Sequence, residues 1–146
     1  MNMLIFVVAS LWLATASPAV QSTDAIPSMV GSYLQIHALL SADKIDGVKP
    51  LASAIASNAE SLGAQGAPVV KAAKALAAAP DLKTTRDAFG PLSDAMIAVA
   101  PPDRLKSLGV KKAFCPMVSR SWLQKDDKIR NPYYGSSMLD CGEIKK

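Results

Sequence analysis

Apolar side chains recur at three- and four-residue steps along most of the first hundred positions, which is the period of an amphipathic helix. The first stripe follows Ser22-Thr23-Asp24, residue types that cap helix N-termini, and it ends where Ser41 to Asp43 break the pattern. The stripe consists of Ile26, Met29, Val30, Tyr33, Leu34, His37 and Leu40. His37, the single histidine of the chain, lies on this apolar face. We therefore expect His37 to be a core residue rather than a ligand.

Three further helices are predicted between the first stripe and Pro101-Pro102. Each has a start or stop signal of its own, and twelve alanines between Leu51 and Pro80 favour thin helices that approach closely. The predicted segments are Val48 to Leu62 before Gly63, Val69 to Ala79 before Pro80, and a helix capped by Asp81 that runs to Val99. Four helices with short connections favour an all-α fold, an antiparallel up-and-down helical bundle over about 24–100.

The remainder, residues 103–146, is called the C-terminal cap and lacks such a period. Val110 to Phe114 reads as a short strand, which leaves room for a short β-hairpin, whereas Trp122-Leu123-Gln124 is expected to start a turn or a short helix. Asn131-Pro132-Tyr133-Tyr134-Gly135 has the composition of a turn. We predict one helical domain, 22–146, with an irregular cap that something must tie to the bundle.

The N-terminal residues 1–19 have the features of a secretory signal peptide. An apolar run, Leu4 to Leu13, is too short to span a bilayer as a mature helix, and it ends in small residues with Ala14-Thr15-Ala16 as a cleavage motif. The mature chain is then expected to begin at Ser17 or Val20, exported and without stable membrane insertion. An uncleaved anchor or a buried first helix remains the alternative, because the segment has no Lys or Arg before its apolar run.

Both cysteines of the chain lie in the C-terminal cap, each with a methionine close by. Cys115 is followed by Met117, and Met138 precedes Cys141. Two thiols and two thioethers form a soft donor set, which selects Cu(I) or Ag(I) over harder ions. The alternative is a Cys115–Cys141 disulfide with the methionines filling gaps in the core. Either reading requires the two cysteines to come together.

Other chemistries find little support in the sequence. One histidine cannot complete a zinc site or a blue-copper site with these cysteines, and neither a catalytic triad nor a phosphate-binding loop is present, so we expect no enzyme. From Asp103 onward ten Lys or Arg face five Asp or Glu, but no aromatic residues are interleaved with them as in nucleic-acid-binding proteins. Nucleic acid is therefore not an expected partner.

The sequence motifs of the C-terminal cap resemble those of an uncharacterised bacterial domain family. The resemblance is carried by Cys115-Pro116-Met117, Trp122-Leu123, Asn131-Pro132-Tyr133-Tyr134-Gly135, and Met138 to Glu143, with helical similarity from Val30 onward. That family occurs alone in periplasmic proteins and fused to adaptor subunits of copper/silver efflux pumps. Here only residues 118–121 separate the first two motifs, which is shorter than usual for the family.

The resemblance implies a periplasmic Cu(I)- or Ag(I)-binding accessory protein of metal efflux. Its metal ligands would be Cys115, Met117, Met138 and Cys141, and its partner a periplasmic adaptor or another efflux component. The alternative is a non-catalytic structural or interaction module of the cell envelope, stapled by a Cys115–Cys141 disulfide.

Overall fold

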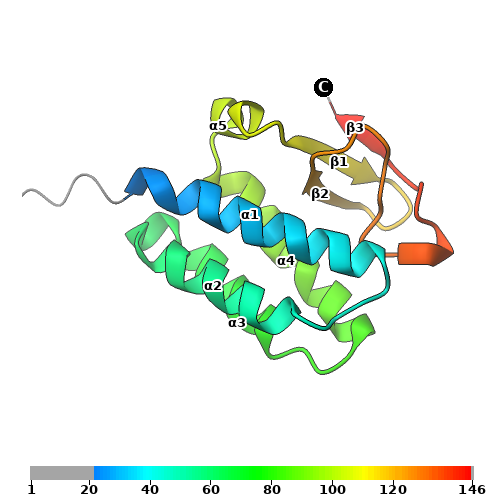
Figure 1. Ribbon diagram of the computed structural model, residues 1–146, viewed down its shortest axis with the longest axis horizontal. Coiled ribbons are helices and arrows are strands. Elements are labelled where there is room, and N and C mark those ends of the chain that lie inside the picture. Colours follow the sequence, from blue (N-terminus) through cyan, green and yellow to red (C-terminus); the bar gives the residue numbers. More distant parts are fainter. Residues whose placement is uncertain (1–21, 146) are drawn as a thin grey trace, which may run out of the picture.

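A computed structural model describes residues 22–145, so the predicted signal peptide lies outside the described residues. The helices of the described chain are α1 (Ser22–Ser41), α2 (Val48–Glu60), α3 (Ala67–Ala77), α4 (Leu82–Val99) and α5 (Pro102–Ser107), with a short 3-10 turn, η1 (Gly63–Gln65), after α2. Each of α2, α3 and α4 runs back along the helix before it (Figure 1). The predicted bundle is thus confirmed for the four long helices.

The helix boundaries follow from capping and from one close backbone approach. Asp81 caps α4, because its Oδ1 accepts a hydrogen bond from the backbone N–H of Thr84 at 2.8 Å. Between α2 and α3, a Cβ on Gly66 would lie 1.9 Å from the carbonyl oxygen of Ala59. Only glycine therefore permits the tight connection that brings α3 back onto α2.

The core of the bundle combines the apolar face of α1 with the alanines of α2 and α3. Tyr33, Ile36 and Leu40 of α1 are fully buried, and the Tyr33 and Phe89 rings stack with centroids 5.0 Å apart. The buried alanines of the second and third helices are Ala52, Ala56, Ala59, Ala72 and Ala73. Small side chains at these positions let the two helices pack closely, as the composition predicted.

The fold is not purely all-α, because the C-terminal cap contains a small antiparallel sheet. Its strands are β1 (Lys111–Cys115), β2 (Arg120–Gln124) and β3 (Glu143–Lys145), in the order β2-β1-β3. The expected turn or short helix at Trp122 was wrong, and neither α5 nor β3 was predicted. Trp122 pairs with Ala113 of β1, and both are buried, so extended backbone there gains ladder bonds and core packing together.

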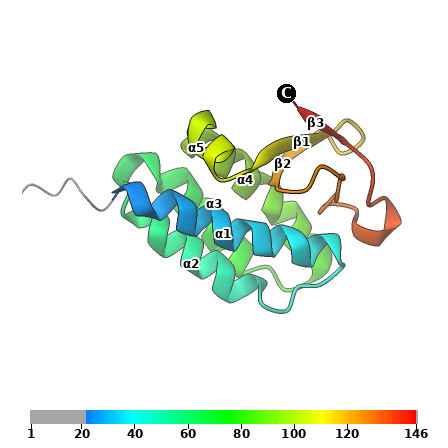
Figure 2. The same cartoon turned by 45° about the horizontal axis from the view of Figure 1, so that its top comes forward.

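The sheet packs over the bundle beside α1 and α4, with α5 next to it (Figure 2). Trp122 and Leu123 join the same hydrophobic core as the helices. Among residues 22–145, no helix is both long and apolar enough to cross a membrane. A second 3-10 turn, η2 (Gly135–Ser137), lies within the long loop between β2 and β3.

Candidate functional site

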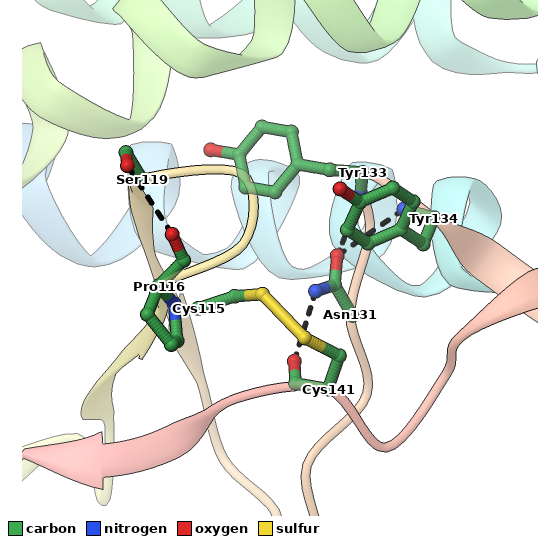
Figure 3. The surroundings of a disulfide bond; sticks show 7 residues. All are labelled: Cys115, Pro116, Ser119, Asn131, Tyr133, Tyr134 and Cys141. Carbon is green, nitrogen blue, oxygen red and sulfur yellow. Dashed lines mark hydrogen bonds between the residues drawn. A yellow bond between two sulfur atoms is a disulfide. The ribbon is translucent and has the colours of Figure 1, made fainter.

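A disulfide joins Cys115, at the end of β1, to Cys141, just before β3 (Figure 3). The two Cα atoms lie 5.9 Å apart, within the range that a disulfide allows. Cys115 is completely buried, on the same side of β1 as Ala113, and Cys141 is partly buried against the core. The prediction that these cysteines come together is confirmed.

The two methionines of the predicted donor set are more exposed to solvent than Cys115. Met117 lies in the turn between β1 and β2, where it is 65% exposed. Met138 is half-buried, and its carbonyl accepts a hydrogen bond from the N–H of Cys141 at 3.1 Å. No group of three or more His, Cys, Asp or Glu among residues 22–145 could hold a metal ion. The four-sulfur set therefore stays a prediction.

Asn131 organises the loop that leads to Cys141. Its Nδ2 donates to the carbonyl of Cys141 at 2.9 Å, while its Oδ1 accepts from the N–H groups of Tyr133 and Tyr134 at 2.8 and 3.2 Å (Figure 3). The side chain is fully buried. A buried amide with both ends satisfied fixes one loop conformation, because any other arrangement leaves polar groups without partners.

Gln124 does the same for the loop after β2. Its Oε1 accepts from Trp122 Nε1 at 2.9 Å and from the N–H of Arg130 at 3.2 Å. Its Nε2 donates to the carbonyls of Asp126 and Lys128 at 2.7 and 2.9 Å. Four hydrogen bonds on one buried amide thus shape the loop that carries the adjacent pair Asp126-Asp127, which lies exposed.

A buried hydroxyl cluster connects the sheet to the bundle. Tyr33 and Ser93 share a hydrogen bond of 2.6 Å, and Tyr33 Oη accepts from the N–H of Leu123 at 3.2 Å. Tyr133 Oη donates to the carbonyl of Ser121 at 2.9 Å, and it lies 3.3 Å from Ser93 Oγ. Burial raises the pKa of Tyr33 well above its usual value and that of Tyr133 to about 12. Both phenols are therefore neutral near pH 7, and they act as hydrogen-bond donors and acceptors between the sheet and the bundle.

His37 is buried, as expected of a core residue. Its Nε2 lies 2.8 Å from the carbonyl oxygen of Arg130, which also accepts from Ser41 Oγ at 3.2 Å. Burial lowers the pKa of His37, so the imidazole is neutral near pH 7 and its Nε2–H donates to that carbonyl. Through this bond to Arg130, the histidine of α1 helps to hold the cap against the bundle.

Arg86 of α4 forms the main polar contact between the bundle and the cap. Its Nε donates to the carbonyl of Pro132 at 2.9 Å, and one terminal nitrogen donates to the carbonyl of Leu40 at 2.8 Å and pairs with Asp43 at 2.5 Å. The other Asp43 oxygen accepts from the N–H and the hydroxyl of Ser136. Gly135 has a φ of 55°, and a Cβ there would meet both Asp43 and Arg86.

The Asp43 contacts predict a loss of stability in acid. Hydrogen bonds from Ser136, then from Arg86, lower the pKa of Asp43 to about 2. In the unfolded chain this carboxyl titrates at about pH 4. Its contribution to the free energy of unfolding is therefore complete above pH ~4 and is lost as the pH falls toward 2. Between about pH 4 and pH 2 the urea midpoint of the wild type should therefore fall more steeply than that of Asp43→Asn. Asp46→Asn, three residues on and exposed, should keep the wild-type slope; equal slopes for wild type and Asp43→Asn would contradict the prediction.

Sequence reasoning missed most of the residues that build the cap. The turn signal at Asn131 was visible, but nothing in the sequence indicated that its amide would reach Cys141. Gln124 and Arg86 carry no local signal, since their partners lie in loops that only the tertiary fold brings near. Comparison with protein-family models, with curated proteins and with solved structures finds no match to this chain.

Proposed function

We propose that this protein is a non-catalytic structural or interaction module of the cell envelope, in which the Cys115–Cys141 disulfide staples the C-terminal cap internally and the cap packs on a helical bundle. The observation that carries the proposal is the buried bond itself, which lies at the end of β1 and beside β3. Disulfides persist in oxidising compartments, so the bond fits an exported, periplasmic location.

The surroundings of the bond support a staple rather than a reactive site. Cys115 is completely buried, and the carbonyl of Cys141 accepts a hydrogen bond from Asn131 Nδ2. Reactive cysteines are partly exposed and lie near positive charge, whereas buried cysteines in apolar surroundings are inert. A staple at this place lets a polar loop of the cap keep one shape and present it to a partner.

A second candidate is Cu(I) or Ag(I) binding by the reduced protein, as an accessory to metal efflux. It is favoured by the exposed thioether of Met117, two residues from Cys115. The disulfide would first take two electrons and two protons from an external dithiol, giving two thiols that lose their protons on binding the metal. Cys115 and Cys141 would then supply thiolates and Met117 and Met138 thioethers, with a periplasmic adaptor or another efflux component as the partner.

One experiment separates the two functions. Protein isolated from the envelope fraction without reductant is alkylated before and after denaturing reduction, and intact mass counts the free thiols. The reduced wild type and Cys115→Ser/Cys141→Ser then compete for copper with a Cu(I) chelator. The proposal expects no free thiol before reduction, two after it, and equal copper retention by both proteins. If the native protein instead has free thiols, and only the wild type holds one copper, the metal-binding function takes the place of the structural one. In that case Met117→Leu and Met138→Leu should weaken copper binding less than the cysteine changes.

A further inference from the structure

A groove lies between α5 and the sheet, and its lining includes neither cysteine of the disulfide. Its volume is about 590 Å³, within the roughly 300–1,000 Å³ of ligand pockets. The floor and walls are apolar and are formed by Ile97, Ala100, Pro102, Leu105, Val110 and Leu123. Residues from the end of α4, from the short α5 and from the strands therefore line one apolar groove.

Four lysines line the same groove, Lys106, Lys111, Lys112 and Lys145, and no acidic residue does. Lys111 pairs with Asp127 and Lys145 with Glu143. Lys106 and Lys112 have no ion-pair partner within residues 22–145. The groove thus offers apolar walls together with two ammonium groups that no carboxylate of the described chain neutralises.

The sheet register places two of these lysines side by side. Lys112 lies directly opposite Lys145 on β3 and opposite Leu123 on β2, so the three side chains share one face of the sheet. Like charges directly opposite each other on neighbouring strands are destabilising. Lys145 already pairs with Glu143, so an anion beside Lys112 would offset the remaining repulsion. The apolar Leu123 at the other end of the row continues into the groove.

From this arrangement we propose that the groove binds a free single-chain amphiphile with an anionic head, of the long-chain carboxylate type. The carboxylate lies between Lys106 and Lys112, and the alkyl chain lies along Ile97, Leu105 and Leu123. This inference rests on the proposed function in one respect, that the protein is an interaction module. It is otherwise independent, because the groove shares no residue with the disulfide site.

Binding is measured on the purified, oxidised protein with decanoate, dodecanoate and tetradecanoate below their micelle concentrations, by calorimetry. Each step in this series adds two methylenes, and every methylene that is buried in the groove should lower the Kd about fourfold. The methyl ester of dodecanoate should bind about tenfold more weakly than the acid, and added salt should weaken only the acid. Binding without any dependence on chain length or on the charge of the head would overturn the proposal.

Charge reversal provides the matched variants. Lys106→Glu/Lys112→Glu should weaken dodecanoate binding by about tenfold or more. Lys44→Glu/Lys71→Glu removes the same net charge at exposed positions outside the groove and should leave binding unchanged. Unaltered thermal unfolding of both variants verifies the fold. Binding to anionic vesicles without binding of monomeric dodecanoate would mean a membrane surface and would also overturn the proposal.

The experiments distinguish an error in the proposed ligand of the groove from an error in the proposed structural role of the disulfide. If dodecanoate does not bind while the thiol count shows an intact disulfide, only the ligand is wrong. If the native protein instead carries free thiols and copper, the proposed function is wrong whether or not the amphiphile binds.

Discussion

Replacing Cys115 and Cys141 by alanine is expected to lower the free energy of unfolding by about 3.5 kcal/mol. The bond joins residues 26 positions apart, and closing a loop of that length removes roughly this much entropy from the unfolded chain at 25 °C. For a domain of this size the midpoint of thermal unfolding should fall on the order of 10 °C. Urea denaturation of the double variant beside the wild type measures the difference.

Reduction of the wild-type disulfide should reproduce most of this loss without any change of side chain. Met117→Leu is the matched control, because this exposed side chain lies in the turn next to Cys115 and its replacement should change stability by less than about 0.5 kcal/mol. A loss below about 1 kcal/mol for both the variant and the reduced protein would show that side-chain contacts alone hold the C-terminal cap.

The bundle was predictable because its signals are local. The apolar stripe that contains Tyr33 and Leu40, the cap at Asp81 and the alanines after Leu51 each indicate helix over a few turns of chain. The four long helices follow these signals, and the residues of the first stripe fill the core. Helix α5 was missed because its six residues carry only the proline start of a helix and no apolar period.

The sheet was harder to predict because its signals are not local. β3 has only three residues, and it forms by pairing with β1, some thirty positions earlier in the chain. Trp122, Leu123 and Gln124 are consecutive in β2 and all buried, so the strand lacks the alternation of buried and exposed residues that marks a strand in sequence. The cysteine pair was the one long-range contact that residue type alone could suggest, and even there the choice between bridge and metal stayed open.

Arg86→Ala is expected to destabilise the protein by about 3 kcal/mol. The guanidinium side chain is 16% exposed and donates to the carbonyl groups of Leu40 and Pro132, which come from α1 and from the cap. Removing it leaves two carbonyls short of a partner, at about 1–3 kcal/mol for each that stays buried. Arg86→Lys should recover only part of the loss, because a single ammonium cannot reach both carbonyls with the geometry of the planar fork.

Lys83→Ala is the matched control on the same helix. Lys83 pairs with Asp87 one turn on, but its side chain is 88% exposed, and such surface pairs contribute less than about 1 kcal/mol. The measurement is urea denaturation at neutral pH, followed by tryptophan fluorescence, since Trp122 lies buried in the cap that Arg86 holds. If Arg86→Ala unfolds at the same urea concentration as Lys83→Ala, water replaces the guanidinium without loss. The attachment of the cap would then rest on the buried Tyr33–Ser93–Tyr133 cluster and the core around Trp122.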